Sequence, residues 1–313
     1  MTTIATSAPA TAGVDRIRRK RRRSLAAALP FVLPGLILVL FFVVWPLVKG
    51  IQMSLYDWNL PRPERSQFVG LANFARALFD DPYFWVATRN TVLYAVITVP
   101  MQMALGLIAA ILLTGSLRGR TVFRALYYLP VVTSWLIVSY VFAFLFSDNA
   151  GPVNYLLVDV LGFLSEPVPW LHQTWTAQVP IMLLGIWKGI GSNMVIFLAA
   201  LQSIPPELYE AARIDGANAL HRFRGITLPL LRPTFQFVSV VLIIGAFNVF
   251  LSVFLLTDGG PERSTEVLLS YMYNQAFTVL DFGYGVTIGL LLGGAVLVLG
   301  FLQRRIMKGS VDY

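Results

Sequence analysis

The sequence predicts an all-α membrane protein. Of its 313 residues, 57% are hydrophobic and only 13% are charged, and the mean hydropathy is +0.69. Soluble domains carry charge on about a quarter of their residues, so this composition excludes an ordinary soluble fold. The apolar residues form long uncharged runs, without the alternation of a membrane barrel strand. Each run is therefore expected to be a helix, because lipid offers no partner to an unpaired backbone group.

Six runs are long enough to cross a bilayer, whose core of roughly 30 Å needs about 20 apolar residues per helix. The expected spans are Leu29 to Val48, Asn90 to Leu113, Leu126 to Phe146, Ala177 to Leu201, Phe235 to Leu256 and Tyr284 to Leu302. They make up one transmembrane domain over residues 28 to 308. A disordered basic arm at 1 to 27 precedes this domain, and a short tail at 309 to 313 follows it.

The distribution of basic residues predicts the orientation. The N-terminal arm, the loops at 115 to 125 and 202 to 234, and the C-terminal tail carry 17 of the 24 Lys and Arg, whereas the alternate loops carry six. Positively charged segments stay in the cytoplasm, so both termini and the 202 to 234 loop are expected there. The arm Arg16 to Arg23 is interpreted as an anchor to anionic membrane lipid, not as a nucleic-acid site.

Several kinds of catalytic chemistry are excluded by composition. The chain has no cysteine and two histidines, His172 and His221, so it has no thiol nucleophile and no multi-histidine metal site. It also lacks a G-x-x-x-x-G-K-[ST] loop for nucleotide phosphates and a paired catalytic carboxylate at membrane depth. We expect no catalytic residues, no metal and no bound cofactor in this chain.

The 202 to 234 loop is expected to contain a short helix. Pro205 and Pro206 end the fourth span and preset the backbone for a new helix, and Glu207 and Glu210 fall in its first turn, where the helix dipole favours anions. These residues predict the start of a separate helix within the loop.

The rest of this helix suits contact with another protein. Ala211 and Ala212 allow close backbone approach, and Gly216 can end the helix in a left-handed conformation. Arg213 offers donors to carboxylates. On these residues alone, a helix docked into a groove and a solvated helix between two spans fit equally well.

The stretch Glu210 to Ala217, EAARIDGA, followed by Ile226 to Pro229, ITLP, resembles the EAA loop of permease subunits of binding-protein-dependent ABC importers. Phe68 to Phe74, Asn90 with Thr91, and Thr257 to Pro261 look like the first of two permease subunits in carbohydrate importers of the maltose, glycerol-phosphate and lactose type. The resemblance covers about Phe31 to Met307. The resemblance does not extend to the large external domain and extra N-terminal spans of the maltose-type relative, so details tied to those parts are not carried over.

The resemblance implies a type I importer permease fold in a prokaryotic cell membrane. In the family, the EAA element couples closure of the ATPase to movement of the spans. The residues that take this role here are Glu210, Ala211, Ala212, Arg213, Asp215 and Gly216. The implied partners are a second homologous permease subunit, two copies of an ATPase that binds ATP and magnesium, and an extracytoplasmic solute-binding protein. The implied substrate is a mono-, di- or oligosaccharide, or a solute of the glycerol phosphate type.

Polar groups inside the spans are candidates for the sugar pathway, because lipid-facing polar side chains are costly. On a continuous fifth span, Gly245, Asn248 and Ser252 would share one helical face. The fourth span adds Trp187 and Asn193, next to Ser192. Each of them also suits ordinary helix packing. Trp135, Gln102 and Tyr140 are weaker candidates.

Lys188 lies inside the fourth span, where a cation costs about 2.5 to 3.5 kcal/mol on insertion scales. It fits the solute pathway, but it also fits a side chain that reaches water or pairs with the second permease. The sequence leaves these two readings open.

The segment Gly259, Gly260, Pro261 and Arg263 is expected to contact the binding protein, as is Tyr56 to Asn59. Turn, aromatic and charged residues together suit a transient wet interface, although ordinary turn chemistry also explains them.

Two alternative functions are weaker. An ion-coupled secondary transporter should carry intramembrane carboxylates for ion coupling, and the six expected spans contain no Asp or Glu. A membrane scaffold or enzyme has no supporting motif. The expected function is therefore solute import coupled to ATP hydrolysis on a separate subunit.

Overall fold

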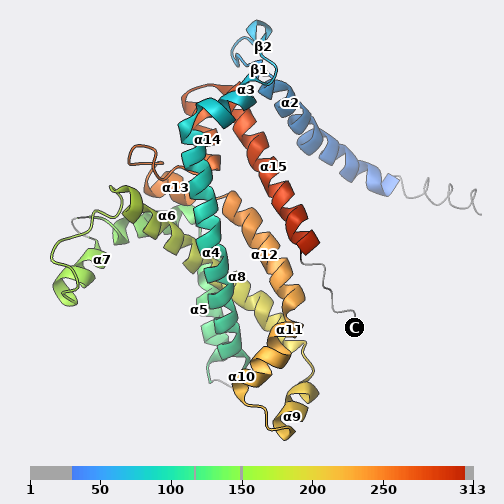
Figure 1. Cartoon of the computed structure of the whole chain (residues 1–313), viewed down its shortest axis with the longest axis vertical. Coiled ribbons are helices and arrows are strands. Elements are labelled where there is room, and N and C mark those ends of the chain that lie inside the picture. Colours follow the sequence, from blue (N-terminus) through green and yellow to red (C-terminus); the bar gives the residue numbers. More distant parts are fainter. Residues whose placement is uncertain (1–29, 116–117, 149–150, 307–313) are drawn as a thin grey trace, which may run out of the picture. The chain divides into compact units, whose positions relative to one another are not determined.

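The computed structural model describes residues 30 to 115, 118 to 148 and 151 to 306 (Figure 1). The expected basic arm at 1 to 27 and the tail at 309 to 313 lie outside these residues. The chain falls into two compact units, residues 1 to 53 and 54 to 313, which are described separately. Helices dominate, as predicted.

The described part of the first unit is a helix that begins at Pro30 and whose last residue, Ser54, is the first residue of the second unit; its mean hydropathy is 2.7 over its most apolar window. A wider turn, η1 (Leu40–Val44), precedes α2 (Trp45–Ser54). Lys49 Nζ donates to Gln52 Oε1 at 3.0 Å and lies 5.3 Å from the Trp45 ring.

The second unit begins with short elements that precede its first long helix. A two-stranded antiparallel ribbon pairs Tyr56 with Phe68 and Asp57 with Gln67, a small departure from an all-α fold. These elements are β1 (Tyr56–Asp57), η2 (Pro63–Arg65), β2 (Gln67–Phe68), α3 (Ala72–Ala75) and η3 (Arg76–Asp80).

Two unbroken helices, α4 (Pro82–Thr114) and α8 (Thr174–Gln202), form the central pair of the second unit. The Asp81 carboxylate begins α4 by accepting hydrogen bonds from the Tyr83 and Phe84 backbone N–H groups, at 2.9 and 3.4 Å. Small residues let the two helices approach closely, which is the usual way that helices pack in lipid.

The expected third span is broken. Helices α5 (Arg120–Val132) and α6 (Trp135–Leu145) meet at 97°, so the prediction of one helix over Leu126 to Phe146 is wrong. Pro130 lacks an N–H group and so weakens the end of α5. Thr133 and Ser134 then adopt extended backbone, with ψ of 146° and 135°.

The expected fifth span is also broken. Helix α12 (Arg232–Phe247) ends at Asn248, and α13 (Leu251–Leu256) begins after Phe250, whose φ is −145°. Gly245, Asn248 and Ser252 therefore do not share a face of one helix, contrary to the prediction. The Asn248 amide donates to the Ile244 carbonyl at 2.7 Å, a local bond of the kind that competes with helix continuation.

The remaining elements complete the second unit. They are α7 (Pro152–Tyr155), η4 (Leu156–Val160), α9 (Pro206–Ile214), α10 (Ala219–Arg222), η5 (Phe223–Thr227), α11 (Leu228–Leu230), α14 (Leu268–Tyr273), η6 (Asn274–Thr278) and α15 (Phe282–Ile306). Among the described residues, four helices are long and apolar enough to cross a membrane, and there are as many as six if each of two bent pairs forms one span.

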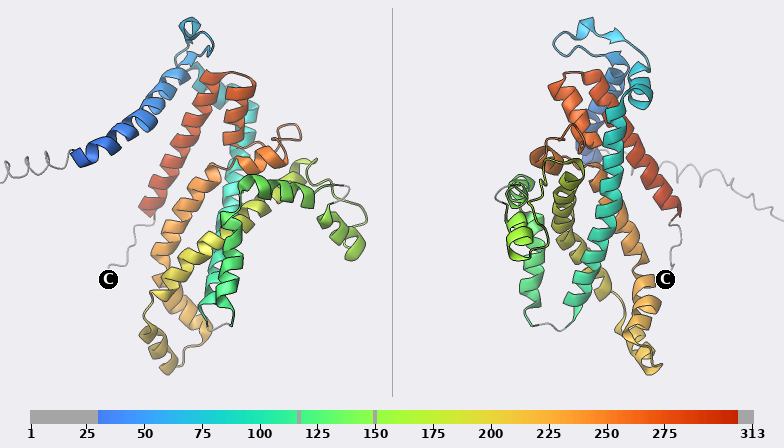
Figure 2. Two further views of the ribbon diagram at one scale, coloured as in Figure 1. Left: turned by 180° about the vertical axis from the view of Figure 1, so that it is seen from behind. Right: turned by 60° about the vertical axis from the view of Figure 1, so that its left-hand side comes forward.

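Figures 1 and 2 show α9 and α10 at one end of the second unit and α3 and α14 at the other. We call these the α9 end and the α14 end. The interior between them contains apolar clusters built largely from α4, α8, α12 and α15.

Candidate functional site

The expected short helix is present as α9 at the α9 end. Pro206 occupies its first turn together with Glu207, whereas Glu210 lies one turn later, which corrects the prediction that both glutamates are in the first turn. Gly216 has φ of +77°, and its N–H donates to the Arg213 carbonyl at 3.1 Å. The left-handed glycine therefore ends this helix as expected.

The residues expected to contact an ATPase lie on the surface of the isolated chain. Five of the six are exposed and Ala212 is half-buried. Tyr209 Oη and Thr227 Oγ1 are 2.9 Å apart, so a hydrogen bond joins α9 to η5. This bond attaches α9 to the segment that continues into α12. The exposed residues of α9 remain available to a partner.

Two adjoining cavities lie between α4, α8, α6 and the broken end of α12. Their volumes are about 300 Å³ and about 470 Å³, and both are lined by Tyr94, Trp135 and Gly245. The smaller cavity adds Gln102, Lys188 and Ser192, and the larger adds Asn248, Phe250 and Ser252. The walls thus combine aromatic rings with polar groups, and among the described lining residues only Lys188 carries a full charge.

Three of the five predicted pathway residues line these cavities. Asn248 and Ser252 line the larger one, and the buried Ser252 Oγ has no hydrogen-bond partner. Lys188 lines the smaller one. The break in the fifth run therefore brings Asn248 and Ser252 to one cavity, although not by sharing a helical face.

Asn193 and Trp187 are not among the described residues that line the two cavities. Asn193 is buried against Gly106 of α4, and its amide donates to the Gly189 carbonyl at 2.9 Å. Trp187 contacts Phe142, with ring centroids 5.9 Å apart. Asn193 therefore has a packing role, whereas Trp187 packs against Phe142 and remains 43% exposed on the isolated chain.

Lys188 is 6% exposed and contacts the residues at the break between α5 and α6. Its Nζ donates to the Pro130 and Thr133 carbonyls, both at 2.7 Å, and lies 5.0 Å from the Trp135 ring centroid. The ammonium group therefore pairs with the Thr133 carbonyl just beyond α5 and shares the Pro130 carbonyl with Thr133 Oγ1, at a helix end where the dipole also favours a cation.

Tyr94 was absent from the predicted set, yet it lines both cavities. A polar stripe along α4 gives the missed signal, because Asn90, Tyr94, Thr98 and Gln102 recur every four residues in an apolar helix. All four are buried. The stripe continues from the α14 end to the smaller cavity.

Glycines on α8 make room for this stripe. A Cβ atom at Gly185 would lie 2.0 Å from Tyr94 Oη, and one at Gly189 would lie 1.9 Å from Gln102 Oε1. The two glycines therefore shape the smaller cavity.

The loop expected to contact a binding protein lies at the α14 end and is held by hydrogen bonds. Thr265 Oγ1 donates to the Gly260 carbonyl at 2.7 Å, and the Asn90 amide donates to the Ser264 and Glu266 carbonyls at 2.7 and 2.8 Å. Of the four predicted contact residues, Gly259 is buried and the other three are half-buried. Most of the predicted contact surface is therefore only partly open in the isolated chain.

Arg263 and a carboxylate network attach the same loop to the spans. The Arg263 guanidinium lies 5.1 Å from the Tyr83 ring and 5.9 Å from the Tyr271 ring. Tyr271 Oη donates to Asp81 Oδ2 at 2.5 Å, and Tyr284 Oη donates to the same oxygen. Burial, with help from Asp81, raises the pKa of Tyr271. The Tyr271 phenol therefore stays protonated at neutral pH and keeps donating to Asp81.

Glu266 ends this loop as a buried carboxyl group, and its Oε2 has no hydrogen-bond partner. Burial raises the pKa of Glu266 to about 7. The negative charges of Asp258 and Asp81 act in the same direction, and Arg263 opposes them. Glu266 therefore titrates near neutral pH at the α14 end.

Comparisons with known proteins agree with this architecture. Residues 102–309 match the family described as "Binding-protein-dependent transport system inner membrane component". The lactose transport system permease protein LacF of Rhizobium radiobacter is 37% identical over 277 residues, which cover 87% of this chain and 91% of that protein. The arabinooligosaccharides transport system permease protein AraP of Halalkalibacterium halodurans is 34% identical over 278 residues, which cover 88% of this chain and 86% of that protein.

A solved structure shares the fold. It is a bacterial alginate ABC transporter in complex with an alginate pentasaccharide-bound periplasmic protein. One of its chains superposes with a TM-score of 0.76 and 26% identity, covering 93% of this chain and 98% of that chain. This chain therefore belongs to the family of inner-membrane components of binding-protein-dependent transport systems and is a multi-pass permease subunit of an ABC importer.

Proposed function

We propose that this permease subunit passes a carbohydrate through the two adjoining cavities. The observation that carries the proposal is the lining they share: the indole of Trp135 and the phenol of Tyr94 beside uncharged hydrogen-bonding groups. An aromatic ring stacks on the apolar face of a sugar, while amides and hydroxyls bind its hydroxyl groups. The volumes, about 300 and 470 Å³, fall within the range of small-molecule sites.

The relatives support this class of substrate. LacF is named for lactose transport and AraP for arabinooligosaccharides, and the solved transporter carries alginate. The proposal covers mono-, di- and oligosaccharides, because the cavity walls select a solute by its hydrogen-bonding groups and not by the number of its sugar units.

Lys188 favours a neutral sugar over a solute of the glycerol phosphate type. Its ammonium group already binds the Pro130 and Thr133 carbonyls and faces Trp135. Two of its three N–H groups are thus held by short hydrogen bonds, so a phosphate would compete with these carbonyls for the charge of Lys188. Within the described residues that line the two cavities, no other side chain carries a full charge.

The energy for import comes, in this proposal, from ATP and magnesium bound by two copies of a separate ATPase subunit. We propose that α9, through Glu210, Ala211, Ala212, Arg213, Asp215 and Gly216, is the helix that docks into it. The exposure of these residues and the glycine-ended helix support this role. In this proposal the α9 end and both termini face the cytoplasm, and the basic residues of the loops support this orientation.

A second homologous permease subunit completes the pathway, and an extracytoplasmic binding protein delivers the sugar at the α14 end. We propose that Gly260, Pro261 and Arg263 contact this binding protein, with Gly259 forming the turn behind them. The periplasmic protein in the solved alginate transporter supports such a partner. The ion-coupled alternative finds no support, because the described spans contain no Asp or Glu.

Two matched tryptophan variants test the proposed pathway in cells that express the whole transporter. Trp135→Leu removes one of the two aromatic rings that line both cavities, and Trp187→Leu removes a ring that packs against Phe142. We expect Trp135→Leu to lower sugar uptake at least about tenfold, equivalent to about 1.4 kcal/mol, with normal membrane levels, and Trp187→Leu to retain most uptake. Equal uptake by the two variants would refute the assignment.

A further inference from the structure

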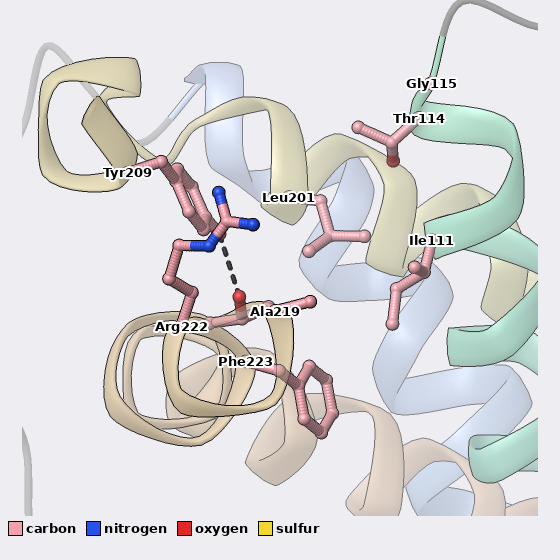
Figure 3. A pocket seen from close by; sticks show the side chains of 9 residues that line it. Ile111, Thr114, Gly115, Leu201, Tyr209, Ala219, Arg222 and Phe223 are labelled. Atoms are coloured by element: carbon pink, nitrogen blue, oxygen red, sulfur yellow. Dashed lines mark hydrogen bonds between the residues drawn. The ribbon is translucent and has the colours of Figure 1, made fainter. Parts of the chain in front are cut away.

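A third cavity lies at the α9 end, away from the proposed sugar pathway. Its volume is about 330 Å³, and Figure 3 shows the side chains around it. One wall comes from the ends of the two central helices, with Ile111 and Thr114 of α4 and Leu201 of α8. The other comes from α9, α10 and η5 (residues 206 to 227), which we call the coupling segment, with Tyr209, Arg222 and Phe223. The cavity thus separates the ends of the spans from the segment that carries α9.

We propose that this cavity binds the phosphate of an anionic phospholipid, with Arg222 as its main ligand. The proposal rests on the proposed function in one respect, namely that the α9 end faces the cytoplasmic leaflet. Basic pockets between membrane helices on the cytoplasmic side are known to take acidic lipid headgroups.

Arg222 provides the charge. Figure 3 shows its guanidinium group pointing into the cavity toward Tyr209 and Leu201. Its Nε is buried and has no hydrogen-bond partner. Among the nine described residues that line the cavity, Arg222 alone carries a full charge, so the lining is positively charged. A guanidinium fork matches two phosphate oxygens, which makes arginine the usual ligand for such a group.

Two nearby groups add to the site. Tyr209 Oη and Thr227 Oγ1 are joined by one hydrogen bond, in which one hydroxyl donates and the other accepts. The accepting hydroxyl still carries its own proton, which can be donated to a phosphate oxygen. Arg124 lies beside the end of α4, where its Nη2 donates to the Leu113 carbonyl at 3.0 Å, and it raises the positive potential next to Thr114.

The apolar side of the cavity favours a lipid over a free anion. Ile111, Leu201 and Phe223 form its hydrocarbon wall, at the point where the two central spans end. This depth corresponds to the headgroup layer, so the glycerol and first acyl carbons of a lipid would contact these side chains. A bound headgroup would join the ends of α4 and α8 to the coupling segment.

The test measures binding and needs neither ATPase nor sugar, so it can fail independently of the proposed function. The purified full-length chain in neutral detergent is titrated with dioleoyl phosphatidylglycerol, with dioleoyl phosphatidylcholine of the same acyl chains, or with inorganic phosphate. The thermal unfolding midpoint is followed. We expect phosphatidylglycerol to raise the midpoint in a saturable way and the other two to have little effect.

Variants locate the site. Arg222→Gln should weaken the phosphatidylglycerol response at least about tenfold, because a charged hydrogen bond is lost. Arg224→Gln is the matched control, since Arg224 is exposed, two residues further on, and outside the lining. Unchanged affinity in Arg222→Gln, equal loss in Arg224→Gln, an equal response to phosphatidylcholine, or an equal response to inorganic phosphate would each overturn the proposal.

A second measurement covers the case in which Arg222→Gln does not fold. A phosphatidylglycerol with a photoreactive headgroup is crosslinked to the unmodified chain, and the labelled peptides are identified by mass spectrometry. Labels on peptides that contain Thr114 or Tyr209 support the site. Labels confined to other parts of the chain contradict it.

Discussion

The coupling segment and the sugar cavities are built in opposite ways. The α9 helix takes its shape from neighbours in sequence: Pro206 begins it and Gly216 ends it. The cavities take theirs from distant residues, since Tyr94, Trp135 and Ser252 come from three separate helices. A coupling element must present a fixed surface to its partner, and residues close together in sequence can encode such a surface. A pathway instead needs a cavity, which forms here where helices from distant parts of the chain break and meet.

Lys188 links the two halves of a break, and its loss should have the largest effect. Lys188→Met leaves the Pro130 and Thr133 carbonyls without this donor. The Pro130 carbonyl keeps a hydrogen bond from Thr133 Oγ1, but the Thr133 carbonyl loses its donor. An unpaired carbonyl away from water costs about 1 to 3 kcal/mol, so we expect a lower thermal unfolding midpoint and loss of sugar uptake. Lys49→Met is the control, because Lys49 lies in the first unit and donates to the nearby Gln52 side chain. If the Lys188→Met protein were as stable as the control, Lys188 would not stabilise the break between α5 and α6.

Gly185→Ala should alter the cavity directly. The new Cβ would lie 2.0 Å from Tyr94 Oη, so the phenol must move. Overpacking of this kind costs about 1 to 3 kcal/mol, and we expect a raised KM for sugar uptake because the cavity wall shifts. Gly293→Ala on α15 meets no atom within 4 Å and serves as the matched control. Similar KM values for the two variants would argue against Tyr94 as part of the wall.

Gly216→Val tests the coupling segment. Gly216 has φ of +77°, and a Cβ atom added there would meet no other atom within 4 Å, so the cost is conformational. A left-handed residue with a Cβ costs about 1 to 2 kcal/mol, and β-branching adds to it. We expect the end of α9 to change and uptake to be lost, with membrane levels unchanged. Gly225→Val, where a Cβ meets open space and φ is not positive, should retain uptake.

Like Gly216→Val, Glu210→Lys should lower uptake by weakening coupling to the ATPase, but by changing the surface charge of α9 and not its backbone. Glu210 is exposed on α9, so the substitution leaves the fold intact and changes the surface offered to the ATPase. Uptake should fall while thermal stability stays within about 0.5 kcal/mol of the unmodified chain. A large loss of stability would show that Glu210 has a structural role instead.

Glu266 gives the smallest effect, a pH dependence at the α14 end. Its pKa is raised from 4.5 to about 7, so its neutral form is favoured in the folded chain. The associated stability is full below pH 4.5 and is lost as the pH rises through about 7. We expect hydrogen exchange in the 257 to 266 loop, corrected for intrinsic rates, to quicken over this range. Glu266→Gln should remove the change, and an unaltered pH profile in that variant would exclude Glu266 as its source.

The same contrast explains what the sequence could predict. Hydrophobic run length identified the spans, and proline, alanine and glycine spacing identified α9, because these signals act within a few residues. The breaks at Thr133 and Asn248 lie inside runs that are apolar overall. Pro130 and the Asn248 side chain are local signals for these breaks, but a measure of run length alone does not register them. Asn193 and Lys188 were polar residues in the same span, yet tertiary contacts gave one a packing role and the other a place at a cavity.

The natural absence of cysteine allows the most direct test of the central claim, that α9 is the contact with the ATPase. A single cysteine at Ala211, on the exposed surface of α9, is crosslinked to single cysteines on the co-expressed ATPase subunit in membrane vesicles. We predict a conjugate of one permease chain with one ATPase chain, and none from a cysteine placed at Pro261. Failure to form any conjugate from Ala211, together with labelling of that cysteine by a membrane-impermeant maleimide in intact cells, would contradict the account.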